Sequence, residues 1–348
     1  MTKPNTSKVR LAVVGCGAVA QIHHVPAIAA SSRVEAAVLV DADEKRAREL
    51  AQRYGVPEVA TDYRELPGQV DGAVVALPNS LHAPVSIELL RRGVHVLVEK
   101  PMAMTVAECD AMIEAARAGR AVLAVGLDFR FFDSSLLVRD LLRDGLIGQI
   151  HRFDLRQGVI PGWPFATDFL LKKEMAGGGV LADFGVHVLD LLLWWLGDLT
   201  ATDYRDDALG GVESDCEMTL ATAAGLTGTV EISRTRNLRN TCVLEGSQAR
   251  LEVGIWDSDP EVRLSIAGSE VALAGHARRG GETGLNFLDT FIRQIDDFAR
   301  AIRGKREPFV PGSEGRRSLA LIESCYVQRR FLELPWSVLP AAGKEPVA

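Results

Sequence analysis

The sequence has few cysteines, and no two of them are close together. Its five cysteines are scattered between Cys16 and Cys325, a spacing that indicates neither a disulfide framework nor a zinc site. We therefore expect no bound metal. The odd number of cysteines and the absence of a recognisable signal peptide favour a reducing cytoplasm.

Two further absences exclude whole classes of protein. Basic residues are fewer than acidic ones, 39 against 46, and the net charge of −7 argues against a nucleic acid or an anionic membrane as partner. The longest apolar run, 186–196, contains an Asp and a His and is too short to span a bilayer. The hydrophobic content of 47% is typical of a soluble globular protein.

What the sequence does contain is a regular alternation of strands and helices over its first third. Short apolar runs, typical of parallel strands buried on both faces, recur with helical segments between them, at 9–14, 34–40, 71–77, 94–98 and 121–125. This pattern predicts a doubly wound parallel sheet, a Rossmann domain, over 1–126. The length of 348 residues predicts a second domain, which we place at 127–334, with a tail at 335–348.

The first apolar run is followed at once by GCGAVA, a G-x-G-x-x-A dinucleotide fingerprint. Gly15 allows a tight turn, Gly17 lets the backbone approach a pyrophosphate, and the small Ala20 lets the helix pack close to the strand. His23 and His24 follow in this helix; they could line the cleft, but we expect them on the helix surface. The residues predicted to bind the cofactor here are Gly15, Gly17, Ala18, Val19 and Ala20.

Asp41 ends the second predicted strand, 21 residues after Ala20. A carboxylate at this place binds the adenosine ribose hydroxyls and repels a 2′-phosphate, so NAD is the expected cofactor. NADP remains an alternative cofactor, because the next helix carries three basic residues that could weaken the preference for NAD: Lys45, Arg46 and Arg48. The alternative role for Asp41 is that of a turn residue or helix N-cap.

Two later strand ends carry residues that a parallel sheet would bring to the same edge. Pro78 and Asn79 follow the third strand, a usual place to meet a cofactor, although a plain turn is the alternative. Lys100 follows the fourth strand, where an ammonium in a desolvated crevice can polarise a reacting oxygen. Pro101 rigidifies the turn after it and is a candidate for a cis peptide bond.

The segment 176–197, AGGGVLADFGVHVLDLLLWWLG, is too apolar to lie in water. Asp183 and His187 are four residues apart, so a helix places them on one face, with Asp190 within reach. A carboxylate one turn from an imidazole can orient it for acid–base catalysis. The alternative is a satisfied pair inside a core. The opening glycines could bring the start of the helix close to a nicotinamide.

From 149 onward the pattern changes to alternating runs. They predict a large, open, mostly antiparallel sheet covered by helices on one face, to which the helices at 286–303 and 313–331 return. We expect the uncovered face to be apolar and to bury against another copy in a homodimer or homotetramer. The predicted strands are 149–158, 201–207, 215–221, 226–234, 241–245, 250–253, 261–266 and 270–274.

In order and spacing, four motifs resemble those of the Gfo/Idh/MocA oxidoreductases: the fingerprint, Pro78-Asn79 with His82, Glu99-Lys100-Pro101, and the 177–187 stretch. The resemblance covers residues 9 to about 331. It implies an NAD(P)-dependent enzyme that transfers a hydride between the nicotinamide and a secondary alcohol or ketone. The substrate would be a sugar, a cyclitol or a nucleotide sugar.

The same resemblance implies roles for individual residues. It makes Lys100, Asp183 and His187 catalytic, and it assigns two weaker substrate candidates, Arg130 and Trp163. Arg130 could equally form an ion pair at the domain junction. The residues implied to line the nicotinamide side of the cofactor are Pro78, Asn79, His82, Glu99, Lys100 and Pro101.

In the implied mechanism, neutral His187 takes the hydroxyl proton while Lys100 donates a hydrogen bond to the same oxygen. Asp183 orients His187 or binds a neighbouring hydroxyl. Two rival functions remain open at this point. One is an NAD-dependent glycosidase that acts by transient oxidation and elimination, and the other is a non-catalytic NAD-binding sensor or regulator.

Overall fold

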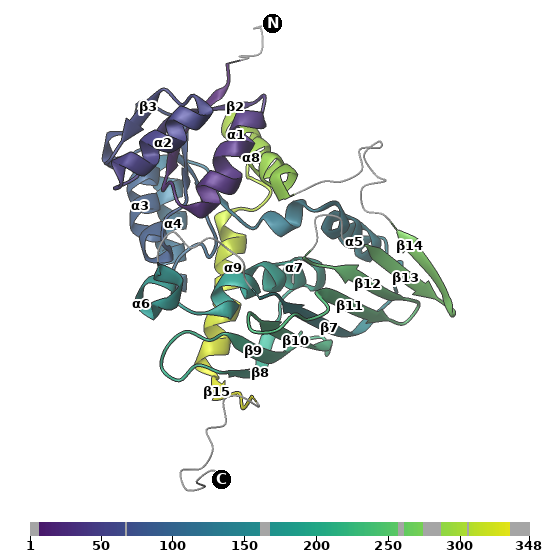
Figure 1. The fold of residues 1–348 in the computed structure, drawn as a ribbon. Helices are drawn as coiled ribbons and strands as arrows, with labels where there is room; N and C mark the ends of the chain where they lie inside the picture. The colour runs from purple at the N-terminus through teal and green to yellow at the C-terminus, as the bar shows by residue number, and fades with distance from the viewer. Residues whose placement is uncertain are drawn as a thin grey trace, which may run out of the picture.

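The computed structural model describes residues 7–66, 68–160, 168–256, 261–273, 287–304 and 306–334. Two β-sheets organise them, a six-stranded parallel sheet near the N-terminus and a nine-stranded mixed sheet in the C-terminal half (Figure 1). This confirms the predicted fold class, a Rossmann domain followed by a large, mostly antiparallel sheet with helices on it.

The six-stranded sheet has the order β3-β2-β1-β4-β5-β6, and its paired strands are all parallel. The order reverses between β1 and β4, and in such sheets ligands bind outside the carboxyl ends of the strands at that point. The strands are β1 (Val9–Val14), β2 (Val34–Val40), β3 (Glu58–Ala60), β4 (Gly72–Val75), β5 (His95–Val98) and β6 (Leu123–Val125).

Helices cover both faces of this sheet, which is why its strands are apolar throughout. Leu11 and Val13 of β1 pack in one core cluster, and Ala12 and Val14 pack in the other. The helices on one side are α1 (Val25–Ala30), α2 (Glu44–Tyr54) and α8 (Phe287–Gly304), and those on the other are α3 (Asn79–Arg91) and α4 (Val106–Gly119).

Local sequence explains where these helices begin. Asp43 caps α2 by accepting a hydrogen bond from the backbone N–H of Arg46. Thr105 and Glu108 form a reciprocal capping box at the start of α4. Before α1, the chain passes through a π-helix, η1 (Ala20–His24), so the first helix is irregular beside the fingerprint.

The nine-stranded sheet has the order β14-β13-β12-β11-β7-β10-β9-β8-β15. Most pairs are antiparallel, but β7 pairs with β10 and β8 with β15 in parallel. The strands are β7 (Ile150–Gly158), β8 (Thr200–Asp206), β9 (Asp215–Ala221), β10 (Thr227–Ser233), β11 (Thr241–Gly246), β12 (Arg250–Gly254), β13 (Val262–Ile266), β14 (Ser269–Leu273) and β15 (Arg330–Phe331).

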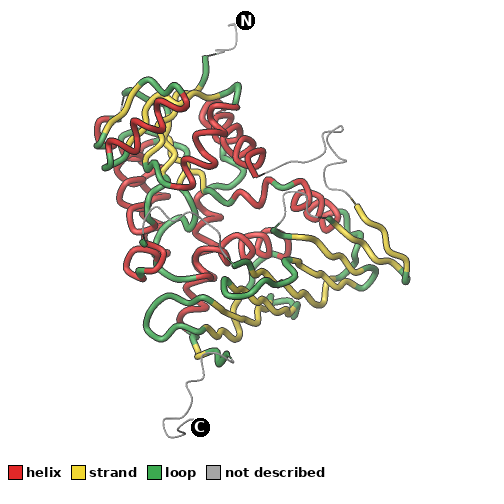
Figure 2. Tube along the Cα trace, in the orientation of Figure 1, coloured by secondary structure: helices red, strands yellow, loops and turns green. Residues whose placement is uncertain are grey.

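Helices cover one face of the nine-stranded sheet and leave the other open (Figure 2). The covering helices include α5 (Asp133–Arg143), α7 (Val186–Leu196) and α9 (Gly312–Val327). Three short helical segments lie beside them and have a place in the site: η3 (Asp128–Phe131), α6 (Lys173–Ala176) and the π-helix η5 (Leu181–Gly185).

The open face of the sheet is charged, so the expectation of an apolar face is wrong. In β7 the buried Phe153 and Leu155 alternate with Asp154 and Arg156, and strand alternation directs the charged pair to the opposite face. A cavity of about 300 Å³ lies on this open face. It is lined by Asp154, Arg156, Asp203, Arg205, Glu217, Met218, Thr219, Thr229, Val230 and Glu231.

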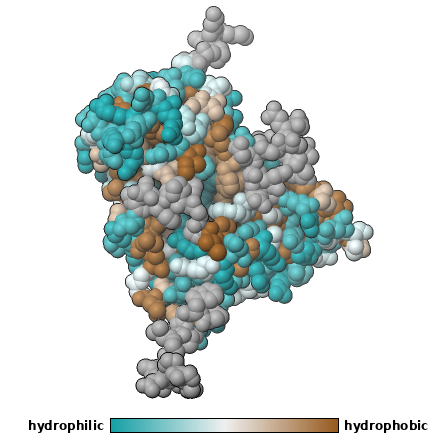
Figure 3. Space-filling view, in the orientation of Figure 1, coloured by the Kyte–Doolittle hydropathy of each residue, from teal (hydrophilic) through white to brown (hydrophobic). Residues whose placement is uncertain are grey.

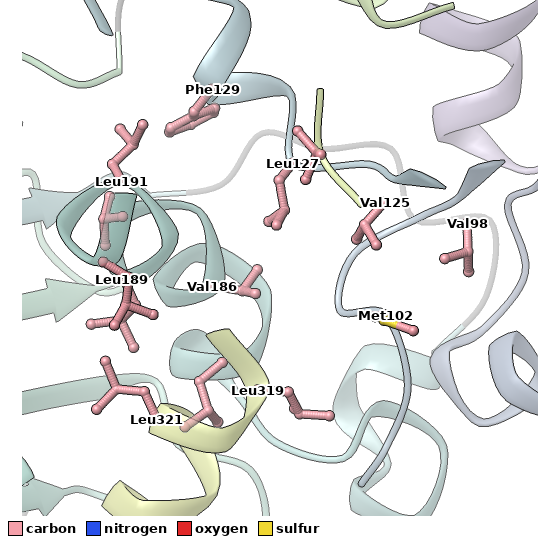
Figure 4. Close-up of a cluster of buried hydrophobic side chains, with 14 of the residues drawn as sticks. Val98, Met102, Val125, Leu127, Phe129, Val186, Leu189, Leu191, Leu319 and Leu321 are labelled. Atoms are coloured by element: carbon pink, nitrogen blue, oxygen red, sulfur yellow. The ribbon is translucent and has the colours of Figure 1, made fainter. Parts of the chain in front are cut away.

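The last two long helices join the two sheets. Helix α8 packs on α1 and β2, and α9 contacts α4 and β6 on one side and α7 and β8 on the other. Figure 4 shows the resulting shared core. It brings together Val98, Met102, Val125 and Leu127 from the Rossmann side, Val186, Leu189 and Leu191 from α7 and its start, and Leu319 and Leu321 from α9.

The helical stretch Lys173–Leu196 is the one stretch, among the residues that the structure describes, that is long and apolar enough to cross a membrane. Within that stretch, 78% of the most apolar window is buried inside the protein. Its apolar character is thus explained by packing against α5 and α9. In Figure 3 hydrophilic residues cover most of the Rossmann domain, and hydrophobic ones gather along the seam between the domains.

Candidate active site

The fingerprint loop lies at the point where the strand order reverses. Gly15 has a φ of +97°, and a Cβ there would collide with the carbonyl oxygen of Ala76, so only glycine fits. By contrast, a Cβ on Gly17 would meet nothing within 4 Å. The backbone is therefore open above Gly17, at the start of a helix, as a bound pyrophosphate requires.

Asp41 is tied to this loop at the end of β2. Its carboxylate accepts hydrogen bonds from the backbone N–H groups of Cys16, at 2.8 Å, and Asp43, at 2.9 Å. The N-cap of α2 is Asp43 and not Asp41, which removes one alternative role. Among the three nearby cations, Arg46 is the one that reaches Asp41, at 3.5 Å. Lys45 pairs instead with Glu49, a residue of its own helix.

The end of β5 supplies Glu99, Lys100 and Pro101, and the Lys100–Pro101 peptide bond is cis, as expected. The ammonium of Lys100 donates hydrogen bonds to Asp183, at 2.7 Å to Oδ1 and 3.1 Å to the backbone oxygen. Two residues 83 positions apart in the chain are thereby brought together. Arg234, at the end of β10, donates a hydrogen bond at 2.8 Å to the other carboxylate oxygen of Asp183.

These contacts determine which groups carry charge. Burial opposes the ionisation of Asp183, but the charges of Lys100 and Arg234 outweigh it and lower the pKa of Asp183. Burial also opposes the charge on Lys100, yet Asp183 and Glu99 outweigh it and raise the pKa of Lys100. The site therefore holds an ammonium donor and a carboxylate acceptor at neutral pH.

Glu99 is paired with a residue that we expected on the surface. His24 is fully buried, and its Nε2 lies 2.6 Å from Oε1 of Glu99. Burial opposes ionisation of Glu99, but the hydrogen bond from His24 and nearby positive charge, including that of Lys100, together outweigh it and lower the pKa of Glu99 to about 2. The surface location predicted for His24 is wrong, because the π-helix turns its ring toward the end of β5.

His187 lies beside this cluster at the start of α7, and only 7% of the residue is exposed. Burial first, and then the charge of Lys100, lower the pKa of its imidazole to about 3, so the ring is neutral. The ring stacks on Phe129 at a centroid distance of 4.3 Å. Its Nδ1 lies 3.4 Å from Oδ1 of Asp128.

Asp183 does not orient His187 in the way that helical spacing predicted. Residues 181–185 form the π-helix η5, so a separation of four residues no longer corresponds to one α-helical turn. Both carboxylate oxygens of Asp183 are instead hydrogen-bonded by Lys100 and Arg234. Asp183 therefore binds the two cations, and the carboxylate nearest to His187 is Asp128.

Sequence reasoning did not select Asp128, although a signal was available. Asp128 comes three residues after β6, at the same edge of the sheet as Lys100 after β5. Arg234, directly after β10, also belongs to the cluster. Its contact with Asp183 depends on how β10 lies under η5, and no local pattern encodes that.

Asn79 and His82 support the turns around the site and do not face an open crevice. The amide of Asn79 donates a hydrogen bond at 2.8 Å to the backbone oxygen of Ala176. The ring nitrogens of His82 each lie 2.8 Å from a backbone carbonyl oxygen, those of Leu77 and Pro101. His82 is 1% exposed, so direct contact with a nicotinamide does not fit, and we correct that prediction.

Arg130 is a structural residue, so its predicted contact with substrate is corrected. The residue is 2% exposed. Its guanidinium binds Asp190 with two hydrogen bonds, at 2.7 and 2.6 Å, and Glu314 with one at 2.6 Å. The ion-pair alternative at the domain junction is the one that fits, and it also uses Asp190. Trp163 lies outside the described residues.

The glycines before η5 have a packing role that differs from the expected one. A Cβ on Gly178 would collide with the hydroxyl of Tyr326, and one on Gly179 with the backbone of Glu213. The carboxylate of Glu213 accepts hydrogen bonds from the N–H groups of Gly179 and Leu181. These glycines thus let the start of the helix pack against Glu213, just before β9, and against Tyr326 of α9.

Known protein families match most of the chain. Residues 9–127 match the family described as "Oxidoreductase family, NAD-binding Rossmann fold", and residues 135–252 match the "GFO/IDH/MocA C-terminal domain". A D-glucoside 3-dehydrogenase of Escherichia coli is 32% identical over 55% of each chain. A putative UDP-kanosamine synthase oxidoreductase subunit of Amycolatopsis mediterranei is 29% identical over 91% of this chain and 95% of its own.

Solved structures extend the similarity to nearly the whole fold. An aldose–aldose oxidoreductase from Caulobacter crescentus, complexed with glycerol, has a TM-score of 0.83 at 26% identity and covers 92% of this chain and 97% of its own. A levoglucosan dehydrogenase in complex with NADH and levoglucosan has a TM-score of 0.84 at 21% identity, with 92% and 97% covered. The second of these supports the fold alone.

Proposed function

This chain belongs to the Gfo/Idh/MocA family of NAD(P)-binding oxidoreductases, and we propose that Lys100, Asp183 and His187 form its active site. It acts as an NAD(P)-dependent dehydrogenase or reductase on a secondary alcohol or ketone of a sugar, cyclitol or nucleotide sugar. The observation that carries the proposed site is the 2.7 Å hydrogen bond from Lys100 to Asp183, next to neutral His187 and at the cofactor edge of the sheet.

The residues around the fingerprint fit a dinucleotide. Gly17 and the start of the helix would hold the pyrophosphate, and Asp41 would bind the adenosine ribose. When bound, the nicotinamide supplies the hydride acceptor or donor. We also propose that NAD is preferred over NADP, because the carboxylate of Asp41 at this position would repel a 2′-phosphate.

Lys100 stabilises negative charge on the reacting oxygen. An ammonium has three N–H groups, and two of those of Lys100 are directed at Asp183. The third remains for a substrate hydroxyl, whose developing alkoxide charge it would stabilise. Asp183 keeps Lys100 protonated and holds it in place, as its lowered pKa supports.

His187 moves the proton. In oxidation the neutral imidazole takes the hydroxyl proton as the hydride leaves the adjacent carbon, and in reduction the imidazolium returns it. Burial and the nearby ammonium disfavour the imidazolium in the free enzyme. The developing alkoxide supplies the negative charge that favours proton transfer in the complex.

A substrate screen with matched variants tests this site. Polyols, sugars and nucleotide sugars would be tested with NAD and NADP by following NAD(P)H absorbance. For the best substrate we expect Lys100→Met and His187→Ala each to lower kcat by about 10²- to 10⁴-fold. NADH binding, followed by fluorescence, should be retained in both. Near-full turnover by either variant would overturn the proposed roles.

The two rival functions are not favoured. Relatives that match include proteins named as dehydrogenases, reductases and oxidoreductases of sugars or nucleotide sugars. A sensor that had lost its chemistry would be expected to lack the lysine or the histidine, and this chain has both. A glycosidase would cleave substrate without accumulating NADH, so the same absorbance screen separates it from a dehydrogenase.

We further propose that the chain forms a homodimer or homotetramer through the open sheet face. Arg156 lies 3.6 Å from Glu231 and Arg205 3.9 Å from Glu217, so opposite charges are interleaved across this face. A second copy with the same pattern could pair with it, and such contacts weaken with salt. Light scattering should give a dimer or tetramer at low salt and a smaller species at 1 M salt, whereas a monomer at low salt would refute the assembly.

We retain a cytoplasmic location as a proposal. All five cysteines are buried and unpaired. Burial raises the pKa of Cys16 and of Cys109 to about 12, so these thiols are unreactive at neutral pH. Such a set of thiols suits a reducing compartment. Fractionation of cells that express the full chain would test it.

A further inference from the structure

The imidazole of His187 has one nitrogen that the proposed reaction does not use. Its Nδ1 is buried and, among the described residues, makes no hydrogen bond. A buried polar atom without a partner is unfavourable, and in a native protein it usually has a reason. The nearest charged group is the carboxylate of Asp128, with Oδ1 at 3.4 Å, slightly too far for a good hydrogen bond.

One short segment contacts both the edge and the face of the His187 imidazole. Asp128 approaches Nδ1, and the next residue, Phe129, stacks on the imidazole with only 17° between the ring planes. Both residues belong to η3, directly after the last strand of the Rossmann sheet. The stack restrains the plane of the imidazole, and Asp128 approaches the edge of the ring at Nδ1.

Asp183 is not available for this task, because its two oxygens are bonded to Lys100 and Arg234. We propose that Asp128 is the positioning residue for His187: its carboxylate accepts the Nδ1–H and leaves Nε2 as the nitrogen that exchanges a proton with the substrate. This inference rests on the proposed function of His187. A small tilt of the ring would close the 3.4 Å gap, and catalytic hydrogen bonds often tighten only when substrate is bound.

The proton and electron balance is simple. The O–H proton of the substrate moves to Nε2 of His187, and the hydride moves from the adjacent carbon to the cofactor, so a C=O bond forms. Nδ1 keeps its own proton throughout. The negative charge of Asp128 stabilises the imidazolium that results.

The surroundings of Asp128 set the pH at which it can act. Burial and the charge of Glu99 raise the pKa of Asp128 to about 7, and the charge of Lys100 opposes this rise. The other charged groups packed around η3 are paired elsewhere, Arg130 with Asp190 and Arg293 with Asp133. As the pH falls below about 7, Asp128 takes up a proton and loses the negative charge that stabilises the imidazolium, so alcohol oxidation should slow.

The test compares Asp128→Asn with a matched control, Asp133→Asn. Asp133 is a buried carboxylate five residues further on, bonded to Arg293, with no contact to His187. The readout is kcat/KM for oxidation between pH 5.5 and 9. The wild type and Asp133→Asn should lose activity below about pH 7, whereas Asp128→Asn should show about 10- to 100-fold lower kcat and no acid limb near pH 7. An acid limb that persists unchanged in Asp128→Asn would overturn the proposal.

A second measurement does not depend on turnover. The ¹⁵N chemical shifts of His187, assigned by loss of its signals in His187→Gln, report which ring nitrogen carries the proton. In the wild type with NADH bound at pH 8, Nδ1 should be protonated and Nε2 bare. The opposite tautomer would refute the role of Asp128 while leaving a catalytic His187 possible. A wild type that turns over no alcohol or ketone would instead refute the proposed function.

Discussion

Asp183 binds two partly buried cations, Lys100 and Arg234, and replacing it by asparagine should affect both the stability of the fold and the charge on Lys100. Its oxygens accept hydrogen bonds at 2.7 Å from Lys100 and 2.8 Å from Arg234, and its side chain is 18% exposed. At an effective dielectric of about 20, two opposite charges 2.7 Å apart attract by about 6 kcal/mol. Much of that attraction offsets the cost of removing the charges from water.

Removing one partner of such a pair leaves a buried charge uncompensated, which costs about 3–5 kcal/mol. We therefore expect Asp183→Asn to lower the free energy of unfolding by about 3 kcal/mol. Asp198→Asn is the control, because Asp198 is 92% exposed in its pair with Arg317 and should contribute under about 1 kcal/mol. Urea unfolding, analysed by linear extrapolation, measures both.

The same substitution changes the ionisation of Lys100. In the wild type Asp183 and Glu99 raise the pKa of Lys100 against the effect of burial. Without the charge of Asp183, the effect of burial is opposed less strongly, and the pKa of Lys100 falls. Lys100 then loses its proton at a lower pH, so the variant should lose its remaining activity at a lower alkaline pH than the wild type. An unfolding free energy within about 0.5 kcal/mol of wild type, together with an unshifted alkaline limb, would refute the reasoning.

Three further predictions follow from other parts of the fold. Asp41→Ala should raise the ratio of kcat/KM with NADP to that with NAD by about tenfold or more, because the repulsion of a 2′-phosphate is lost; an unchanged ratio would exclude Asp41 from the ribose site. Arg130→Met should lower the free energy of unfolding by about 3–5 kcal/mol, because Asp190 is left unpaired, while KM in the folded variant stays within a few-fold of wild type. A large rise in KM with normal stability would restore Arg130 as a substrate contact. Gly17→Val should weaken NADH binding at least tenfold with little loss of stability, since its Cβ would point into open space; unaltered NADH affinity would place the cofactor elsewhere.

Much of the site could be predicted because parallel sheets place strand ends together. Lys100 follows β5 and Asp41 ends β2, and a doubly wound order brings both to one edge whatever the details of packing. The glycine pattern after β1 could be interpreted from the sequence because it reflects steric requirements. At Gly15, for example, any Cβ would collide with the backbone oxygen of Ala76.

The partners of the predicted residues could not be derived in the same way. The i, i+4 rule linked Asp183 to His187, but it assumes an α-helix, and the chain forms a π-helix there. Arg234 is 51 residues away from Asp183, so their contact depends on tertiary packing. Arg130 was a substrate candidate and Asp190 was expected within reach of His187, but these two residues, 60 positions apart, form a buried ion pair.

The charge of the open sheet face was present in the sequence and was misjudged. In the middle of β7 three residues that alternate with the buried ones are charged, Arg152, Asp154 and Arg156. The alternation of apolar and charged residues along this strand therefore already indicated one buried apolar face and one charged face of the sheet. The expectation of an apolar face rested on the general tendency of open sheets to be covered by another subunit, and not on the residues of this strand.

The central claim is that His187 and Lys100 carry out proton transfer beside a bound nicotinamide cofactor. Its most direct test is the rate of NADH formation in a single turnover, with the best alcohol substrate and saturating NAD, for wild type and His187→Ala. The account predicts a rate at least about 10²-fold lower in the variant, with NADH affinity within a few-fold of wild type. Equal rates for the two proteins would contradict it.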